Sequence, residues 1–191
     1  MIQRIREASP HLRARLAGVF YLLAVLSAAF AESFVHGRLL YAAGLIPVAS
    51  FAVVTLLLCQ LLKPVNRNLA WVAALFNLFG LTLEALEWHF RGVNIALVFH
   101  GLYCLLVGYL VFRSAFLPRI FGVLMAVGGL AWLTDLSIPL TDHLSPYNVM
   151  AGFLGEGLPM LWFLVIGVNA QRWKAQAGTG VEGPSLNVHR S

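Results

Sequence analysis

The run NIALVFHGLYCLLVGYLVFR, residues 94–113, decides the fold class of this chain. No Asp, Glu, Lys or Arg stands between Ile95 and Phe112. An α-helix of about 17 to 25 apolar residues spans the hydrocarbon core of a bilayer, which is about 30 Å thick. The run therefore predicts a transmembrane helix, which we place at residues 92–113.

Similar apolar runs precede and follow it. Of the 191 residues, 60% are hydrophobic and only 11% are charged, whereas an ordinary globular domain has about 25% charged residues. The chain is predicted to be an all-α polytopic membrane protein, a bundle of six transmembrane helices in a single domain over residues 1–174, followed by a disordered cytoplasmic tail over residues 175–191. The predicted spans are residues 15–34, 39–62, 68–90, 92–113, 118–135 and 149–171.

The first span has a second interpretation. A basic start, an apolar middle and the small residues around Ala29 and Ala31 are also typical of a secretory signal with its cleavage site. The apolar stretch is long for a signal, and Phe34 and Val35 continue it, which favours an uncleaved helix. Cleavage would leave five helices in the same orientation.

Basic residues indicate the orientation, because Lys and Arg near the ends of spans are retained on the cytoplasmic side. With six spans, only Arg38 and Arg91 fall on the opposite side. Both termini are therefore predicted to be cytoplasmic, in a multi-pass protein of the plasma (inner) membrane whose partner is the lipid bilayer. The net charge of +5 follows from this topology and does not indicate nucleic-acid binding. The basic residues on the predicted cytoplasmic side are Arg4, Arg6, Arg13, Arg15, Lys63, Arg67, Arg113, Arg119, Arg172 and Lys174.

Acidic residues outside the two tails all fall on the outer half of the predicted bundle. Two of them, Glu84 and Glu87, lie near the end of the third span in LEALEWHFRG, residues 83–92. At about 100° per residue, one narrow stripe of that helix carries the polar side chains, which indicates that they point into the bundle. The outer-half acids are Glu32, Glu84, Glu87, Asp135, Asp142 and Glu156; the stripe contains Asn77, Gly80, Glu84, Glu87, Trp88 and Arg91.

Depth along the helices narrows the candidates. At about 1.5 Å per residue, Glu84, His100 and Glu156 lie at a similar level, about 9 to 12 Å from the outer ends of their spans. Titratable groups at such depth usually face a cavity or one another. We therefore predict an outward-opening polar pocket between the third, fourth and sixth spans, with Glu32 and Asp135 at its rim. The candidate catalytic residues are Glu84 and Glu156, and the candidate ligand-binding residues are Glu32, Asn77, Glu87, His100 and Asp135.

A structural interpretation competes with this one. Carboxylates near the interface can extend into water, and a single neutral imidazole can hydrogen-bond to a neighbouring helix. The tryptophans Trp71, Trp88, Trp132 and Trp162 are more typical of interface anchors or packing residues than of a binding site. The two cysteines, Cys59 and Cys104, fall at different membrane depths and are not expected to pair.

Three classes of function agree with the pocket. The first is an intramembrane enzyme in which Glu84 or Glu156 acts as an acid on an isoprenoid-like lipid. The second is a ligand-binding, signalling or proton- or cation-coupled transport protein, and the third is a partner-binding subunit. The cofactor is left open. Glu84, His100 and Glu156 are chemically suited to a three-ligand zinc centre, but no short ligand spacing supports one.

Three stretches carry a resemblance to a known family: residues 15–35, residues 61–76 and residues 100–135. The most specific part is GYLVFRSAFLPRIFGVL, residues 108–124, with Gly-Tyr-Leu, a basic residue with Ser, then Leu-Pro-Arg and a glycine-bearing helix. The chain resembles the bacterial membrane family known as domain of unknown function 4386. The resemblance implies a small polytopic bundle, and it supplies no activity and no catalytic residues.

Overall fold

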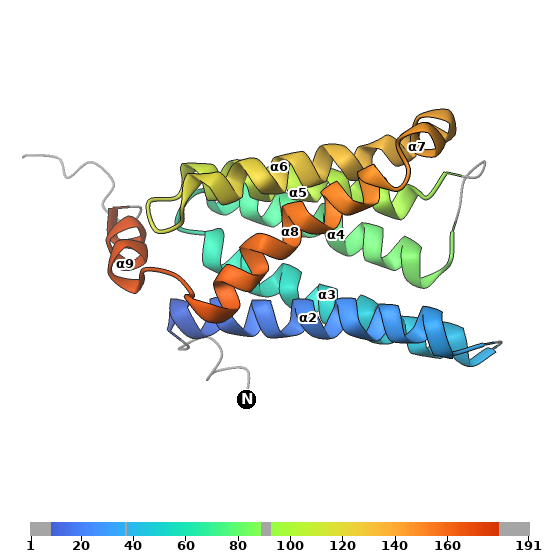
Figure 1. Ribbon diagram of the computed structural model, residues 1–191. Coiled ribbons are helices and arrows are strands. Elements are labelled where there is room, and N and C mark those ends of the chain that lie inside the picture. Colours follow the sequence, from blue (N-terminus) through green and yellow to red (C-terminus); the bar gives the residue numbers. More distant parts are fainter. Residues whose placement is uncertain (1–8, 37, 89–92, 180–191) are drawn as a thin grey trace, which may run out of the picture.

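The structure, a computed structural model, describes residues 9–36, 38–88 and 93–179 (Figure 1). Six helices in these ranges are long and apolar enough to cross a membrane, so the predicted all-α bundle of six spans is confirmed. The helices are α2 (Pro10–Phe34), α3 (Arg38–Leu62), α4 (Arg67–Ala85), α5 (Ile95–Arg113), α6 (Arg119–Leu133), the 3-10 turn η1 (Thr134–Leu136), α7 (Ile138–Leu144), α8 (Tyr147–Val165) and α9 (Ala170–Thr179).

Two spans end earlier than the hydropathy pattern predicts. The third was expected to reach residue 90, but α4 ends at Ala85 because Glu87 has a left-handed backbone with φ of 50°. The sixth was expected to reach residue 171, but α8 ends at Val165, and Gly167 with φ of 76° turns the chain toward α9. Apolar residues continue past both ends, so hydropathy alone does not mark these breaks.

Some predictions fall on residues outside the described ranges. These are the end of the third span at residues 89–90, the start of the fourth at residue 92, Arg91, and the tail beyond residue 179. Within the predicted tail, residues 175–179 form the last part of helix α9.

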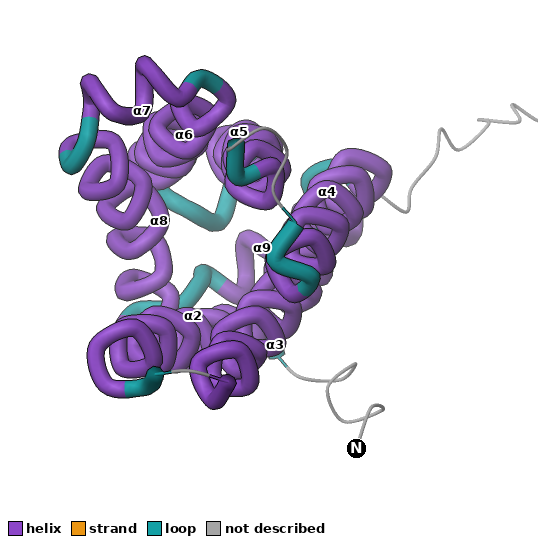
Figure 2. The backbone as a smooth tube through the Cα atoms, turned by 90° about the vertical axis from the view of Figure 1, so that its right-hand side faces the viewer, coloured by secondary structure: helices purple, strands orange, loops and turns teal. Residues whose placement is uncertain are grey.

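The six spans form a closed ring when viewed along their length (Figure 2). Each spanning helix packs against two neighbours, in the order α2, α3, α4, α5, α6, α8 and back to α2. The chain therefore follows the ring from one helix to the next, and α7 and α9 lie at its two ends (Figure 1).

Glycines permit a close approach between α5 and α6. A Cβ atom at Gly122 would meet the carbonyl oxygen of Gly108 at 2.6 Å, and one at Gly129 would meet that of Gly101 at 2.7 Å. Real Cβ atoms do not come so close, so only glycine permits this spacing. Small residues at such contacts are typical of membrane helices, whose association relies on close packing because lipid tails are as apolar as the side chains.

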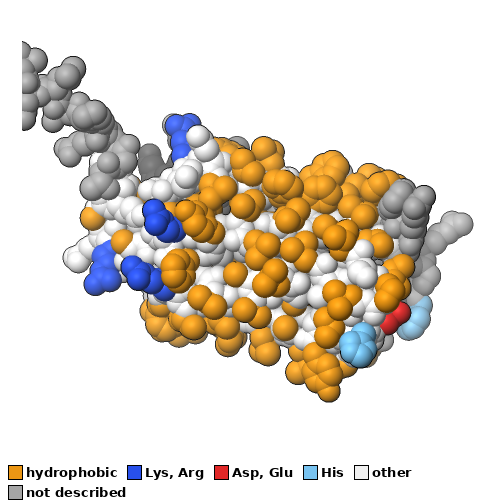
Figure 3. Space-filling model, turned by 90° about the horizontal axis from the view of Figure 1, so that it is seen from above, with side chains coloured by type: hydrophobic (Ala, Val, Ile, Leu, Met, Phe, Trp, Pro, Cys, Tyr) orange, Lys and Arg blue, Asp and Glu red, His pale blue; other side chains and the backbone are white. Residues whose placement is uncertain are grey.

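The two ends of the bundle differ in charge (Figure 3). The basic end carries Lys63, Arg113, Arg119 and Arg172 where α3, α5, α6 and α9 begin or end, and the opposite, acidic end carries Glu32, Glu84 and Asp142. The buried apolar core extends toward the basic end, where it includes Leu58, Leu61, Leu62, Leu110, Val111 and Phe163.

We predict that the basic end faces the cytoplasm. Alkaline phosphatase fused after Lys174 should then be inactive, and a cysteine introduced at Ser145, beside α7, should react with a membrane-impermeant maleimide in intact spheroplasts. An active phosphatase at Lys174, or labelling at position 145 only after permeabilisation, would contradict this orientation.

Candidate functional site

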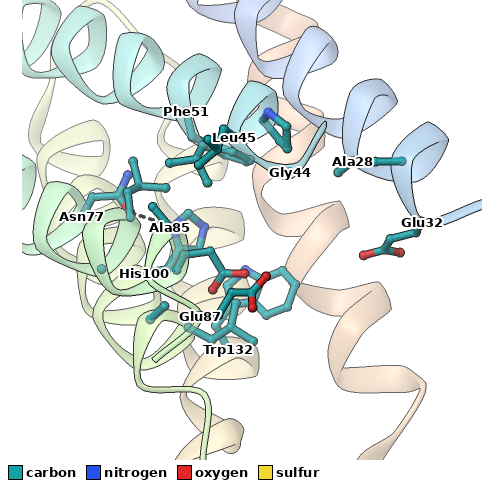
Figure 4. Close-up of a pocket in the computed structure, with 18 of the residues that line it drawn as sticks. Ala28, Glu32, Gly44, Leu45, Phe51, Asn77, Ala85, Glu87, His100 and Trp132 are labelled. Atoms are coloured by element: carbon teal, nitrogen blue, oxygen red, sulfur yellow. Dashed lines mark hydrogen bonds between the residues drawn. The ribbon is translucent and has the colours of Figure 1, made fainter. Parts of the chain in front are cut away.

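A cavity of about 440 Å³ lies between the helices in the half of the bundle toward the acidic end (Figure 4). All six spans contribute to its lining, not only the three that the sequence predicts. Its exposed lining residues include Glu32, Tyr41 and Glu84, near the ends of α2 and α4 and the start of α3. These residues form the mouth, and the polar side chains farther along the helices form the floor.

The floor is a hydrogen-bonded chain of buried polar groups. Asn77 of α4 is 1% exposed and Glu156 of α8 is 4% exposed. Between them, His100 of α5 places Nδ1 2.8 Å from Asn77 Oδ1 and Nε2 3.0 Å from Glu156 Oε1. Three of the residues predicted from the sequence are thus brought together, from three different helices.

A further contact determines which groups donate and which accept in this hydrogen-bonded network. The hydroxyl of Thr55 in α3 donates to the carbonyl of Phe51 (2.8 Å), so its oxygen accepts from the Asn77 amide nitrogen (2.6 Å). The amide oxygen of Asn77 therefore faces His100, and because it can only accept, Nδ1 of His100 carries a proton and donates. The remaining ring nitrogen, Nε2, faces Glu156.

Glu156 also accepts a hydrogen bond from α6. The indole Nε1 of Trp132 donates to Glu156 Oε1 over 2.5 Å. A Cβ at Gly152 would lie 2.5 Å from Cε2 of the same indole, so the absence of a side chain at Gly152 makes room for the ring. Glu156 and Gly152 lie one turn apart on α8, so this helix supplies both the acceptor and the space for its donor.

The other predicted site residues take different positions. Glu84 was expected to join His100 and Glu156 at one depth, but because α4 ends at Ala85 it stands in the last turn of its helix and is exposed. It lines the cavity near the mouth, and among the described residues its hydrogen-bond partner is Asn94, at 3.5 Å, and neither His100 nor Glu156. Glu84 therefore faces the same cavity as His100 and Glu156, but it does not share their hydrogen bonds.

The structure separates the two residues of the predicted rim. Glu32 lines the cavity and extends inward from α2, across from His100 and Asn77 (Figure 4). Asp135 lies in η1 and is not among the described residues that line the cavity, so its place at the rim is wrong. Glu87 does line the cavity, but from the turn after α4, so the predicted helical stripe does not extend to Glu87 and Trp88.

Cys104 is an unexpected neighbour of His100. It is buried, with its thiol free, and its Sγ lies 3.7 Å from His100 Nε2. His100, Cys104 and Glu156 each offer one ligand atom, and these atoms all lie within 4.8 Å of one another. Such a set of donors is able to hold a metal ion.

Sequence reasoning missed Thr55, Cys104 and Trp132. A signal existed for Cys104, because the i, i+4 spacing from His100 places both side chains on one face of a helix. Trp132 looked like an interface residue, yet it is buried against Glu156, 24 positions away in the chain. No pattern within one helix indicates such a contact.

Comparison with known proteins agrees with the sequence resemblance. The family described as domain of unknown function (DUF4386) matches residues 80–167, which run from the end of α4 to just after α8. An uncharacterized protein of Archaeoglobus fulgidus is 26% identical over 118 residues, covering 56% of this chain and 70% of that relative. No solved structure matches the chain significantly.

The family match includes the helices that carry His100, Cys104, Trp132 and Glu156, whereas Asn77 and Thr55 precede it. Over residues 80–167 this chain is therefore similar to the membrane family described as domain of unknown function 4386, as the sequence resemblance predicted.

Proposed function

We propose that this membrane protein binds one small amphipathic organic molecule, a lipid or a lipid-like compound, in the cavity between its six helices. The observation that carries the proposal is a cavity of about 440 Å³ with apolar walls and polar groups at both ends. Ligand pockets are typically about 300 to 1,000 Å³ in volume and combine apolar walls with a few polar groups that orient the ligand.

The walls favour an apolar body for the ligand. Leu45, Val48 and Phe51 of α3 face the cavity together with Leu97 of α5 and Phe153 of α8. Transfer of apolar surface from water into such a site contributes about 25 cal/mol for each Å² that is buried. A molecule that enters from the bilayer gains less free energy from this burial, because it already lies among apolar lipid chains. Its polar groups must therefore supply the selectivity of binding.

The mouth favours a head group that donates hydrogen bonds or carries positive charge. Glu32 and Glu84 supply carboxylates to the lining there, and a carboxylate only accepts hydrogen bonds. Tyr41 stands beside them, with its hydroxyl donating to the carbonyl of Ala85 over 3.0 Å. We therefore assign Glu32 and Glu84 to the head group of the ligand, and the apolar walls to its body.

Gly44 offers a direct test of occupancy. It lines the cavity, and a Cβ built there has no neighbouring atom within 4 Å. Gly44→Leu should therefore fold, because leucine favours helix by close to 1 kcal/mol relative to glycine, but its side chain should fill the space that the ligand needs. Mass spectrometry of small molecules that copurify with the wild type should show a compound that Gly44→Leu has lost.

Gly178→Leu in α9 is the matched control. A Cβ added at Gly178 would also have no neighbour within 4 Å, and Gly178 does not line the cavity, so this variant should retain the compound at the wild-type ratio. Glu84→Gln should retain less of it, because an amide holds a cationic or donating group more weakly than a carboxylate. Equal retention by wild type and Gly44→Leu would show that the cavity is not the binding site.

A further inference from the structure

We infer that His100, Cys104 and Glu156 form a zinc site at the floor of the cavity. Zinc in tetrahedral coordination binds nitrogen, sulfur and oxygen at about 2.0 to 2.3 Å, which places ligand atoms roughly 3.3 to 3.6 Å apart. The Nε2 to Oε1 distance is 3.0 Å and the Nε2 to Sγ distance is 3.7 Å, so these two pairs need shifts of a few tenths of an ångström. All three ligand atoms lie within 4.8 Å of one another.

The second ring nitrogen of His100 is held as in a metal-binding histidine. A metal-ligating imidazole usually donates its other N–H to an oxygen atom, which fixes the ring and leaves the first nitrogen free to bind. Here Nδ1 donates to Asn77 Oδ1, and Asn77 is itself held by Thr55. The lone pair of Nε2 is thereby directed at the space beside Cys104 and Glu156.

Charge also fits a zinc ion. A thiolate at Cys104, a carboxylate at Glu156 and a neutral imidazole at His100 carry two negative charges, which a divalent cation cancels. A neutral cluster suits a buried site within a membrane, where an uncompensated charge is costly. Calcium and magnesium require oxygen ligands, whereas the mixture of thiolate, imidazole and carboxylate is typical of zinc.

The fourth coordination position faces the cavity. His100 and Glu156 both line the cavity, whereas Cys104 lies behind them. Three protein ligands with one open position are the arrangement of catalytic zinc sites, and a fourth protein ligand would be typical of a structural one. A molecule in the cavity would thus reach the metal directly, although the metal site does not depend on such a molecule.

Metal titration of the full-length protein in detergent tests this inference. After removal of metals with a chelator, we expect uptake of one zinc ion per chain, and cobalt(II) in the same site should show the intense near-ultraviolet charge-transfer absorption of a cobalt–thiolate bond. Cys104→Ser should lose that absorption. Cys59→Ser, which alters the other free and buried cysteine, should keep it.

A variant that keeps all three ligands distinguishes a direct effect on zinc binding from a general loss of structure. Asn77→Ala removes the partner of Nδ1 and keeps all three ligands, so it should still bind one zinc ion, with an affinity about 10- to 100-fold lower. Gly44→Leu should bind zinc as the wild type does, so failure of the organic-ligand proposal and failure of the zinc proposal are separable. A folded wild type that takes up no zinc, or a cobalt spectrum unchanged in Cys104→Ser, would overturn the inference.

Discussion

Glu156→Ala is expected to lower the free energy of unfolding by about 3 to 5 kcal/mol, the usual cost of removing one partner from a buried pair. Glu156 is 4% exposed and accepts from Trp132, and it faces His100 Nε2 at 3.0 Å. Alanine would leave the indole N–H without its acceptor in an apolar setting, and each such unsatisfied group costs about 1 to 3 kcal/mol. Thermal unfolding in detergent, followed by loss of the monodisperse peak, measures the effect.

Two further variants separate hydrogen bonding from charge. Glu156→Gln retains an acceptor for Trp132 and a polar group toward His100, so most of the stability should return, while zinc uptake should fall. Glu84→Ala at the exposed mouth should leave the melting temperature close to that of the wild type. Equal losses in Glu156→Ala and Glu84→Ala would show that the floor network contributes nothing particular to stability.

Gly122→Val is expected to prevent normal packing of α5 against α6. A Cβ at Gly122 would meet the carbonyl oxygen of Gly108 and the backbone nitrogen of Phe112, both at 2.6 Å. Neither atom belongs to a flexible side chain, so the helices themselves must separate. Overpacking typically lowers the free energy of unfolding by about 1 to 3 kcal/mol and sometimes more. We expect a loss at the upper end of this range, because the added side chain meets backbone atoms.

The yield of monodisperse protein and its melting temperature report this effect. The matched control is Gly44→Val, which adds the same side chain to a spanning helix where a Cβ has no neighbour within 4 Å. We expect Gly44→Val to express and melt like the wild type. If Gly122→Val does so as well, the contact between α5 and α6 is looser than the structure indicates.

The number and approximate position of the spans could be predicted from the sequence alone. The backbone polar groups of each span form hydrogen bonds within their own helix. A span can therefore be recognised from its length and apolar composition, which are local properties of the sequence. The end of α4 could not be predicted in this way, because apolar and polar residues alternate past Ala85 and the break at Glu87 is a backbone conformation. The same break explains why the helical pattern predicts too great a depth for Glu84.

For the site, helix face placed Asn77 and depth placed Glu84, His100 and Glu156 among the candidates, and of these four, Asn77 and Glu156 lie within hydrogen-bonding distance of His100. The depth of a residue in the membrane does not determine which neighbouring helix its side chain contacts. The order of the ring and the glycine contacts decide that Trp132 of α6 reaches Glu156 of α8 past Gly152, and that Thr55 of α3 orients Asn77 of α4. Helix periodicity is a property of one segment, whereas a hydrogen bond between helices depends on their rotation and separation, so only the tertiary structure brings Cys104, His100 and Glu156 together in one cluster.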